Sequence, residues 1–392
     1  GSFSGSGDLQ WALDQAVVAQ VFGHDLDLVG LGSWLAQAGV SVPELETVEG
    51  RGLFQATVTG SLTDPRFSGK LLVTDPVWHG EKLDLLTANF AYSKAILSIE
   101  KAEALQGIAR VAVTGQINVS QPSPRFYLKT AVQDVDMARI NRIFDLKLPL
   151  SGVLNANFNL DGVWPQLALR GPVSLEDGMV LDLPLEEVRG QLSLAKNRIE
   201  FNQVTAEIAG AQVRTNGVWE DNELAAVLQI DDVDFAILNK FIPPANQPRL
   251  AGQGSFSGLL SGPWTDLALE GTIDAAGLAY QDYHLDRGKG KVRYNLAQHL
   301  LSLDSLRLYQ NASLVKVTGE VNLADGFRYN LDLDLDKVTL ADLAQVTKNL
   351  TWPEINGELS GFVQLGGIGS NFSGRSLIQC RQLQYHDLQY DG

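Results

Sequence analysis

Side chains that commonly do chemistry are few in this sequence, and they are scattered along it. The five histidines are His24, His79, His284, His299 and His386. No two of them have a spacing typical of metal ligands, and the single cysteine, Cys380, allows neither a disulfide within the chain nor a zinc site of paired thiolates. We therefore expect no metal site and no cofactor.

The alternating aspartates of LDLDLD in 331–336 have both a chemical and a structural interpretation. Asp332, Asp334 and Asp336 lie on one face if this segment is a strand. Their carboxylates could form a calcium site, but a solvated outer face of a sheet is the favoured interpretation.

Motifs of nucleophilic and phosphate-transfer enzymes are also missing. The glycine cluster LGGIGSNFSG in 365–374 lacks the lysine of a phosphate-binding loop, so we interpret it as a turn. No G-x-S-x-G motif occurs, and no carboxylate pair stands out from the acidic background. The sequence thus predicts that the protein is not an enzyme.

The composition is that of a folded, acidic protein. Of the 392 residues, 45% are apolar and 19% are charged, which is typical of a folded chain. The formal net charge of −16 argues against nucleic acid or anionic lipid headgroups as partners of the outer surface. No uncharged apolar stretch is long enough to span a membrane, so we expect any anchor to lie outside these residues.

A repeat of about 102 residues organises the chain. Similar glycine-containing segments begin at Gly52, Gly152, Gly254 and Gly357. We expect the tail of a preceding repeat in 1–51, full repeats in 52–151, 152–253 and 254–356, and the start of a further repeat in 357–392. The chain is thus expected to be a fragment of a longer protein.

Each repeat has the periodicity of β-strands. In 154–160 apolar residues occupy the even positions and asparagines the odd ones, which predicts a strand with one dry and one wet face. For the first repeat we predict strands at 52–60, 67–74, 83–93, 95–106, 109–119 and 125–135. The short connections, rich in Gly, Asp, Asn and Pro, indicate antiparallel neighbours.

One short helical segment is expected per repeat, such as 136–145. Asp136, Asp234 and Thr339 are its expected N-caps in successive repeats. Glycines also recur inside the strands, in the series Gly69, Gly171, Gly271, Gly374 and the series Gly115, Gly217, Gly319. Because glycine within a strand often marks a bend, we expect both series, and the glycines that begin the repeats, to let the sheet curl along fixed lines.

The dry face of such a sheet is too large for one short helix per repeat to cover. It must either fold into a solid core or curl into an open groove, and the mixture of small and large residues on it favours the groove. The register of 81–92 stays open, because Leu83, Leu85 and Leu86 break the alternation. The residues expected to line the groove are Phe54, Val58, Phe90, Leu154, Phe158, Leu160, Leu192, Leu194, Phe201, Val292, Leu301, Leu303, Val317, Leu359 and Val363.

The segments VTGSLTDPRFSGKLLV at 58–73 and LSGPWTDLALEGTI at 260–273, with a closing V-D-x-A-x-L/I helix, resemble the TamB and AsmA-like family of the Gram-negative cell envelope. The resemblance implies an elongated hydrophobic β-groove, the β-taco, in the periplasm, anchored to the inner membrane by a segment outside these residues. It implies phospholipids as cargo and, for some members, an Omp85-type outer-membrane partner that binds parts not present here. No family motif names catalytic residues.

Three alternative functions are therefore considered for this sequence. In a lipid conduit, acyl chains lie on the dry face, and a charge placed there, as in Leu194→Arg, blocks passage. An assembly chaperone for outer-membrane β-barrel proteins would instead pair with unfolded strands through backbone hydrogen bonds and survive that change. A structural stalk would use the same residues as a solid core without a cavity.

Overall fold

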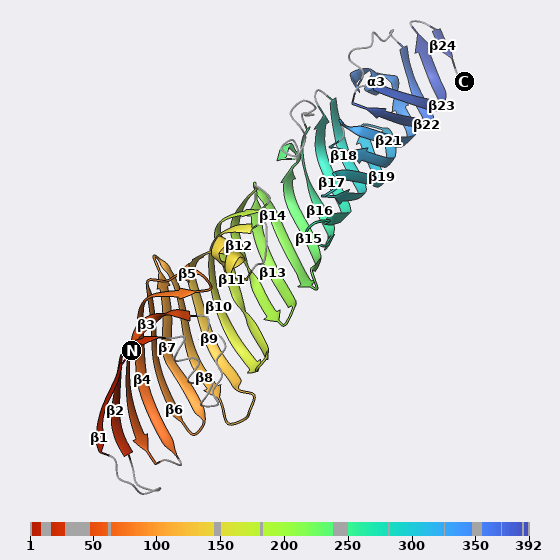
Figure 1. Cartoon of the computed structure of the whole chain (residues 1–392). Coiled ribbons are helices and arrows are strands. Elements are labelled where there is room, and N and C mark those ends of the chain that lie inside the picture. Colours follow the sequence, from red (N-terminus) through yellow and green to blue (C-terminus); the bar gives the residue numbers. More distant parts are fainter. Residues whose placement is uncertain are drawn as a thin grey trace. The chain divides into compact units, whose positions relative to one another are not determined.

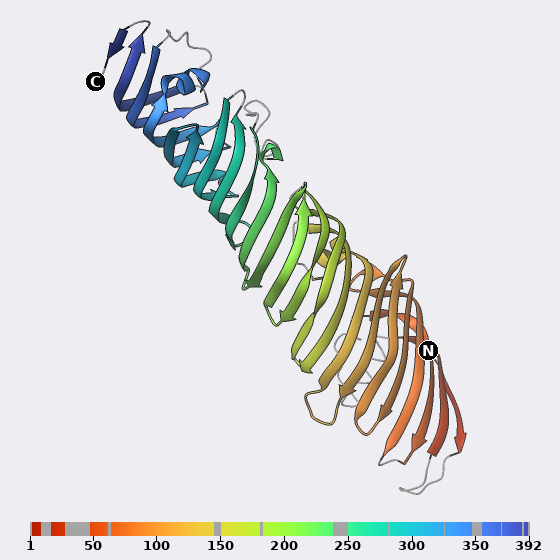
Figure 2. The same cartoon turned by 180° about the vertical axis from the view of Figure 1, so that it is seen from behind.

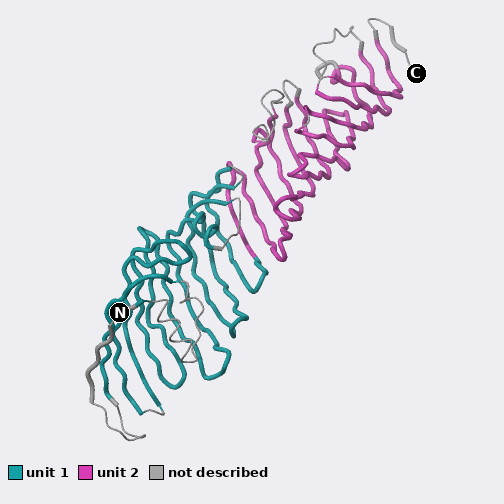
Figure 3. The backbone as a smooth tube through the Cα atoms, viewed as in Figure 1, with its two compact units in different colours: residues 1–200 teal, residues 201–392 magenta. Residues whose placement is uncertain are grey.

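The computed structural model describes most of the chain. The described residues are 2–8, 17–27, 48–61, 64–144, 150–180, 183–237, 250–280, 283–324, 326–346, 355–369, 371–385 and 388–390. They divide into two compact units, residues 1–200 and 201–392, which Figure 3 colours separately. Three predictions concern residues outside this set. Parts of the preceding repeat predicted in 1–51 are not described, and neither are His386 and the end of the second repeat at 238–249.

Among its described residues, unit 1 is a sheet of mostly long strands with one short helix, shown in red to yellow in Figure 1 and from behind in Figure 2. Its elements are β1 (Ser2–Asp8), β2 (Val17–Asp27), β3 (Val48–Gly60), β4 (Pro65–Trp78), β5 (Glu81–Lys82), β6 (Leu85–Ser93), β7 (Ile96–Gln106), β8 (Ala109–Asn118), β9 (Arg125–Asp136), α2 (Met137–Phe144), β10 (Leu150–Val163), β11 (Gln166–Val180) and β12 (Leu183–Ala195).

Unit 2 is built from the same kinds of secondary-structure element. After β13 (Arg198–Ile208), which contains the boundary, its elements are β14 (Ala211–Glu220), β15 (Glu223–Asp234), β16 (Leu250–Gly262), β17 (Ala268–Tyr280), β18 (Tyr283–Asn295), β19 (Leu300–Gln310), β20 (Ser313–Asn322), β21 (Arg328–Thr339), α3 (Leu340–Val346), β22 (Ile355–Ile368), β23 (Asn371–Tyr385) and β24 (Leu388–Tyr390).

Within each unit, successive strands pair with one another and run antiparallel. The connections are tight: Lys94 and Ala95, with φ of 51° and 59°, join β6 to β7 and place Ser93 opposite Ile96. Such primed two-residue turns suit the natural twist of a hairpin. The predicted fold class, a repetitive antiparallel all-β sheet with short helices, is confirmed, and the sheet is open and curled. Neither α-helix in the described residues is long and apolar enough to cross a membrane.

The sheet bends at one glycine near the start of each repeat. Gly152 has a φ of 131°, and the register between β10 and β11 shifts between Ser151 and Val153, so Gly152 is a β-bulge. A positive φ and a register shift coincide again at Gly50 in β3 and at Gly252 in β16. The neighbouring strand has a positive φ opposite each of these glycines, at Asp75, Asp177 and Gly277. We call these paired positions the bend line.

The prediction that Gly69, Gly171 and Gly271 mark bends is wrong. Their strand pairing continues without a register shift, and none of them has a positive φ. They provide room instead: a Cβ at Gly69 would lie 2.8 Å from Cζ of Phe90, and one at Gly271 would lie 2.6 Å from Cζ of Phe256. Gly69 and Gly271 therefore leave room for an aromatic ring, whereas at Gly171 the backbone of Asn157 occupies the space.

The second glycine series divides between these two uses. Gly115 and Gly319 have φ of 138° and 128°, a region that other residues rarely adopt. Gly217 has no positive φ, and a Cβ there would lie 2.5 Å from Cζ of Phe201. The position in the repeat thus predicts that a glycine is needed. It does not predict whether the reason is a positive φ or the lack of room for a Cβ.

Short helices follow the last strand of a repeat, and their predicted caps are confirmed. In α2, the carboxylate of Asp136 accepts a hydrogen bond of 2.8 Å from the backbone N–H of Ala138. In α3, the hydroxyl of Thr339 accepts one of 3.1 Å from the N–H of Asp342. Asp234 caps a short 3₁₀ turn at 235–237 in the same way.

The best-buried side chains gather beside the bend line and under the helices. Val73 and Pro76 are fully buried next to Gly50. Leu175 lies against Gly152 and is only 5% exposed. The helices add buried residues of their own, among them Met137 of α2, which is 8% exposed. The core of the described residues therefore lies along the bends and under the helices, with a further buried cluster of Leu224, Ala226 and Leu267 at the strand ends of unit 2.

Candidate functional site

Each sheet has two chemically different faces, which the strand pairing defines. In β12, Leu192 and Leu194 are partly buried, whereas Gln191 on the other side of the strand is exposed. Leu192 lies opposite Gly171, and Leu194 lies opposite Leu169 of β11, so the apolar side of one strand continues into the next. We call this side the apolar face and the opposite side the polar face.

On the apolar face of unit 1, one row of neighbours crosses ten strands. Each member is the pairing partner of the next: Val21, Ala56, Gly69, Phe90, Ile99, Gly115, Leu128, Leu160, Leu169 and Leu194. At the usual spacing of paired strands, this row is about 45 Å long. It contains no charged residue and no side chain that needs a hydrogen bond.

All eight predicted lining residues of unit 1 lie on this face. They are Phe54, Val58, Phe90, Leu154, Phe158, Leu160, Leu192 and Leu194, and each of them is partly buried. A residue inside a solid core would be inaccessible to water. Away from the bend line, the described residues therefore leave this part of the apolar face incompletely covered.

Unit 2 has a corresponding row across its own ten strands. Its members are Thr215, Leu228, Gly258, Gly271, Val292, Leu303, Gly319, Leu331, Leu365 and Gly374. The predicted lining residues of this unit lie on the same face: Phe201, Val292, Leu301 and Val363 are partly buried, and Leu303, Val317 and Leu359 are buried. The apolar face thus has the same construction in both units.

Aromatic rings gather on the apolar face of unit 1. The rings of Phe67 and Tyr92 stack with centroids 4.6 Å apart, and Phe54 stacks on Phe90 at 6.1 Å. An edge contact of 6.3 Å between Phe67 and Phe90 joins the two pairs. The four rings make a rigid patch across β3, β4 and β6, of a kind that favours acyl chains or other apolar ligands.

The pairing also resolves the ambiguous segment 81–92. Leu86, Ala88, Phe90 and Tyr92 lie on the apolar face, because they are partners of Val73, Leu71, Gly69 and Phe67. Leu85 lies on the polar face opposite Thr74. The backbone N–H of Leu83 donates to Pro76 outside the regular ladder, which is why the alternation breaks there.

In unit 2 the apolar face is closed at the strand ends by a tryptophan pair. The turn between β16 and β17 carries Trp264, whose ring meets Trp219 of β14 edge-on at 5.7 Å. Both pack against the buried residues Leu224 and Leu267. The corresponding turn of unit 1 carries Trp164, which is 39% exposed. The two units therefore differ at this end of the apolar face.

Charged side chains pair across strands on the polar face. Arg287 of β18 donates two hydrogen bonds, of 2.9 and 2.6 Å, to the carboxylate of Asp274 in β17, and Lys289 donates one of 3.0 Å. The hydrogen bonds from Arg287, followed by those from Lys289, lower the pKa of Asp274 to about 2. The polar face is therefore a solvated, ion-paired surface.

Asp332 and Asp334, which were considered as calcium ligands, contact side chains of neighbouring strands. Asp332 accepts a hydrogen bond from Gln364, and Asp334 pairs with Lys316 at 3.1 Å. Cys380 is a free, partly buried cysteine. Among the described residues, no group of three or more His, Cys, Asp or Glu side chains could hold a metal ion.

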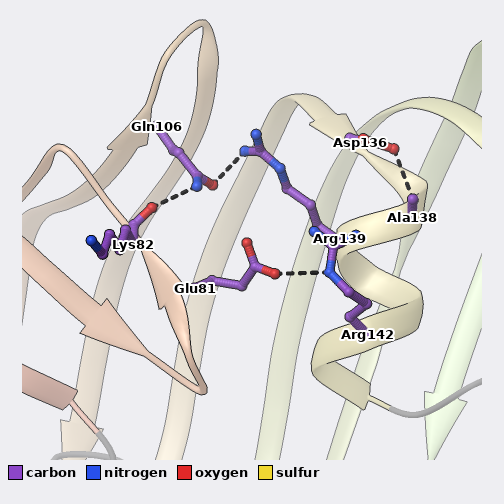
Figure 4. Close-up of polar contacts among 7 residues, drawn as sticks. All are labelled: Glu81, Lys82, Gln106, Asp136, Ala138, Arg139 and Arg142. Atoms are coloured by element: carbon purple, nitrogen blue, oxygen red, sulfur yellow. Dashed lines mark hydrogen bonds and ion pairs between the residues drawn. The ribbon is translucent and has the colours of Figure 1, made fainter.

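A group of polar contacts ties α2 to the strand ends of unit 1 (Figure 4). Nε of Arg142 donates to Glu81 of β5 at 3.0 Å. The guanidinium of Arg139 donates to the side-chain oxygen of Gln106, the last residue of β7, and the amide nitrogen of Gln106 donates to the backbone carbonyl of Lys82. The helix thus reaches back over three strands that precede it.

Sequence reasoning missed most of these neighbours. Tyr92 and Leu97 could have been paired from the two-residue turn between β6 and β7, since a tight hairpin determines its register. No local sequence pattern predicts the contacts of α2, because Glu81 and Arg142 are 61 residues apart in sequence.

Comparison with known proteins adds no relative, since no protein-family model, curated protein or solved structure matches the chain.

Proposed function

We propose that this chain is part of a hydrophobic conduit that carries phospholipids, with acyl chains on the apolar face and headgroups in water at the strand ends. The observation that carries the proposal is the uncharged row across ten strands of unit 1, whose members Leu160, Leu169 and Leu194 are only partly buried. A long apolar strip that the described chain leaves partly uncovered fits a chain-like apolar ligand.

The energetics of the row suit transfer. Each methylene removed from water contributes about 0.8 kcal/mol, so an acyl chain is held firmly. Successive positions along the row offer similar apolar surroundings, from Phe90 through Ile99 to Leu128. Moving by one strand therefore changes the free energy little, and the lipid can slide.

The resemblance to the TamB and AsmA-like family supports the same function and suggests its place. On that basis we propose a periplasmic conduit between the inner and outer membranes, anchored to the inner membrane by a segment outside these residues. An Omp85-type outer-membrane protein is the proposed partner, through parts that are not in this chain.

Lipid extraction tests the proposal. The protein is purified from a bacterial host under mild conditions and extracted with organic solvent, and the extract is analysed by mass spectrometry. Leu194→Arg places an unpaired charge in the row of unit 1 and should clearly reduce the amount of bound phospholipid. Gln191→Arg adds the same charge to the polar face of the same strand and should leave the lipid unchanged. A stable wild-type protein free of lipid would refute the conduit.

A strand-binding chaperone is the second candidate, and β23 favours it. Phe372 and Leu377 of this strand are 71% and 81% exposed. A peptide that pairs with β23 through its backbone should bind equally well to Leu194→Arg, whereas a lipid should not. A solid stalk is disfavoured, because it would bury the row completely.

A further inference from the structure

Arg139 of α2 is a partly buried arginine to which the described residues give no carboxylate partner. Its guanidinium is partly buried at the strand ends, and the partner that the described residues give it is the neutral side-chain oxygen of Gln106. The neighbouring Arg142, by contrast, pairs with the carboxylate of Glu81. In a chain of net charge −16, a partly buried arginine that meets an amide and no carboxylate is unusual.

The position of Arg139 in α2 is also unfavourable for a cation. It is the third residue after the cap Asp136, in the first turn of α2, which contains no acidic residue. The N-terminal turn of a helix disfavours a cation, because the backbone dipoles place partial positive charge there. The equivalent positions after Asp234 and Thr339 hold Ile237 and Asp342. The helix therefore does not need an arginine at this point.

The surroundings of Arg139 suit an anion that is attached to something apolar. Met137, in the same helix turn as Arg139, and Ala109 at the start of β8 are each only 8% exposed. Ala109 is on the same face of β8 as Gly115 and is the pairing partner of Gln106, so Gln106, to which Arg139 donates, lies at the end of the apolar face. Figure 4 shows the side chains of Arg139 and Arg142 directed toward Gln106 and Glu81, and the ammonium end of Lys82 directed away from the helix.

We propose that Arg139, with the amide of Gln106 beside it, binds the phosphate of an anionic phosphate ester at the strand ends of unit 1. A guanidinium presents several N–H donors in a planar fork that matches two phosphate oxygens. The amide nitrogen of Gln106 can turn from the carbonyl of Lys82 to the same phosphate. In the conduit, which this inference presupposes, the ester is a phospholipid headgroup whose acyl chains continue onto the apolar face.

A competition between two phospholipids tests whether Arg139 selects an anionic headgroup in the proposed conduit. Wild-type protein, Arg139→Gln and Arg66→Gln are each incubated with equal amounts of dioleoyl phosphatidylglycerol and dioleoyl phosphatidylcholine, and the bound lipids are quantified by mass spectrometry. Arg66 is an exposed arginine of β4 that pairs with Asp64 at the opposite strand ends, so its variant is the matched control. We expect wild-type protein and Arg66→Gln to be enriched in phosphatidylglycerol and Arg139→Gln to lose that enrichment. Equal ratios in all three would overturn the headgroup assignment.

A soluble probe separates this inference from the proposed function. Titration with sn-glycerol 3-phosphate, followed by calorimetry, should show binding that weakens about tenfold in Arg139→Gln and less in Arg139→Lys, which keeps the charge but loses the fork. If wild-type protein takes up no lipid but this difference persists, the conduit fails and the site binds free phosphate esters. If Arg139→Gln, folded by circular dichroism, binds the probe as wild type does, the inference fails.

Discussion

Gly171 illustrates how single residues decide the form of the sheet. A Cβ at this position would lie 1.9 Å from the backbone oxygen of Asn157 on the neighbouring strand, so no other residue fits without moving β10. At the equivalent positions, a Cβ at Gly374 would lie 2.4 Å from the backbone oxygen of Gln364, and Gly69 and Gly271 also face aromatic rings closely. The close approach of strands, and not backbone flexibility, is the reason for these residues.

Gly171→Ala should therefore destabilise the protein by about 1–3 kcal/mol, the usual cost of forcing an atom into a packed site. Gly366→Ala is the matched control, since its Cβ would lie 3.8 Å from the nearest atom and neither glycine has a positive φ. Urea unfolding of both variants measures the difference. Equal midpoints would mean that the strands adjust freely at Gly171.

Asp274 carries the clearest pH dependence on the polar face. The hydrogen bonds from Arg287 and Lys289 lower its pKa from 3.8 to about 2, so its contribution to stability is present above pH 3.8 and is lost as the pH falls through 2. Its side chain is 32% exposed, so this contribution is about 1 kcal/mol or less.

The stability difference between wild-type protein and Asp274→Asn should accordingly shrink between pH 4 and pH 2, and it should also shrink as salt is added. Urea midpoints at several pH values measure it. A difference that stays constant over this range would show that the carboxylate does not contribute through its charge.

The short helices are elements whose stability comes from contacts with distant strands. α3 is joined to the start of β20 by Ser313, which is 3% exposed and donates a hydrogen bond of 2.7 Å to the carboxylate of Asp342. The hydroxyl of Thr339 donates a second hydrogen bond of 2.7 Å to the same carboxylate. A helix of seven residues would not form alone, so these bonds and its packing on β21 and β22 hold it in place.

Ser313→Ala removes a donor from a buried carboxylate, so we expect a loss of about 1–3 kcal/mol. Ser257→Ala, at an exposed position of β16, should change stability by less than about 0.5 kcal/mol. Hydrogen exchange of the α3 amides locates the effect. Unchanged protection of α3 in Ser313→Ala would show that the contact with Asp342 does not hold the helix.

At the level of elements, much of this fold was predictable. The strand at 125–135 was expected from alternation and observed as Arg125–Asp136, because the period of two is a property of the local chain. The caps Asp136 and Thr339 were likewise local, since a cap bonds to residues two or three positions ahead. The tie between Glu81 and Arg142 was not predictable, because nothing near either residue in sequence specifies the other.

The molecule as a whole repeats one design, a curled sheet with a buried strip at the bends and a partly covered apolar face beyond it. Both units have a row of paired residues across ten strands, with Leu194 in one and Val292 in the other. If the apolar face holds lipid, each unit should hold its own share.

Leu194→Arg and Val292→Arg should therefore each remove part of the bound phospholipid, and the double variant should remove nearly all of it. Quantitative lipid analysis against protein amount measures this. Ser257→Arg, on the polar face of unit 2, serves as the control. Complete loss in either single variant would show instead that the two units bind lipid cooperatively.

Local chemistry in the sequence was enough to predict an all-β repeat, the dry side of most strands, the helix caps and the residues on the apolar face, because each of these depends on neighbours a few positions away. The expectation that recurring glycines mark bends holds at Gly152 and fails at Gly69, because the two glycines look alike in sequence but differ in φ and in what lies across the strand. The coverage of the apolar face, the register of Leu86 and the neutral partner of Arg139 depend on contacts between distant segments. Such contacts form only when pairing registers accumulate across many strands, so they became visible only in the folded chain.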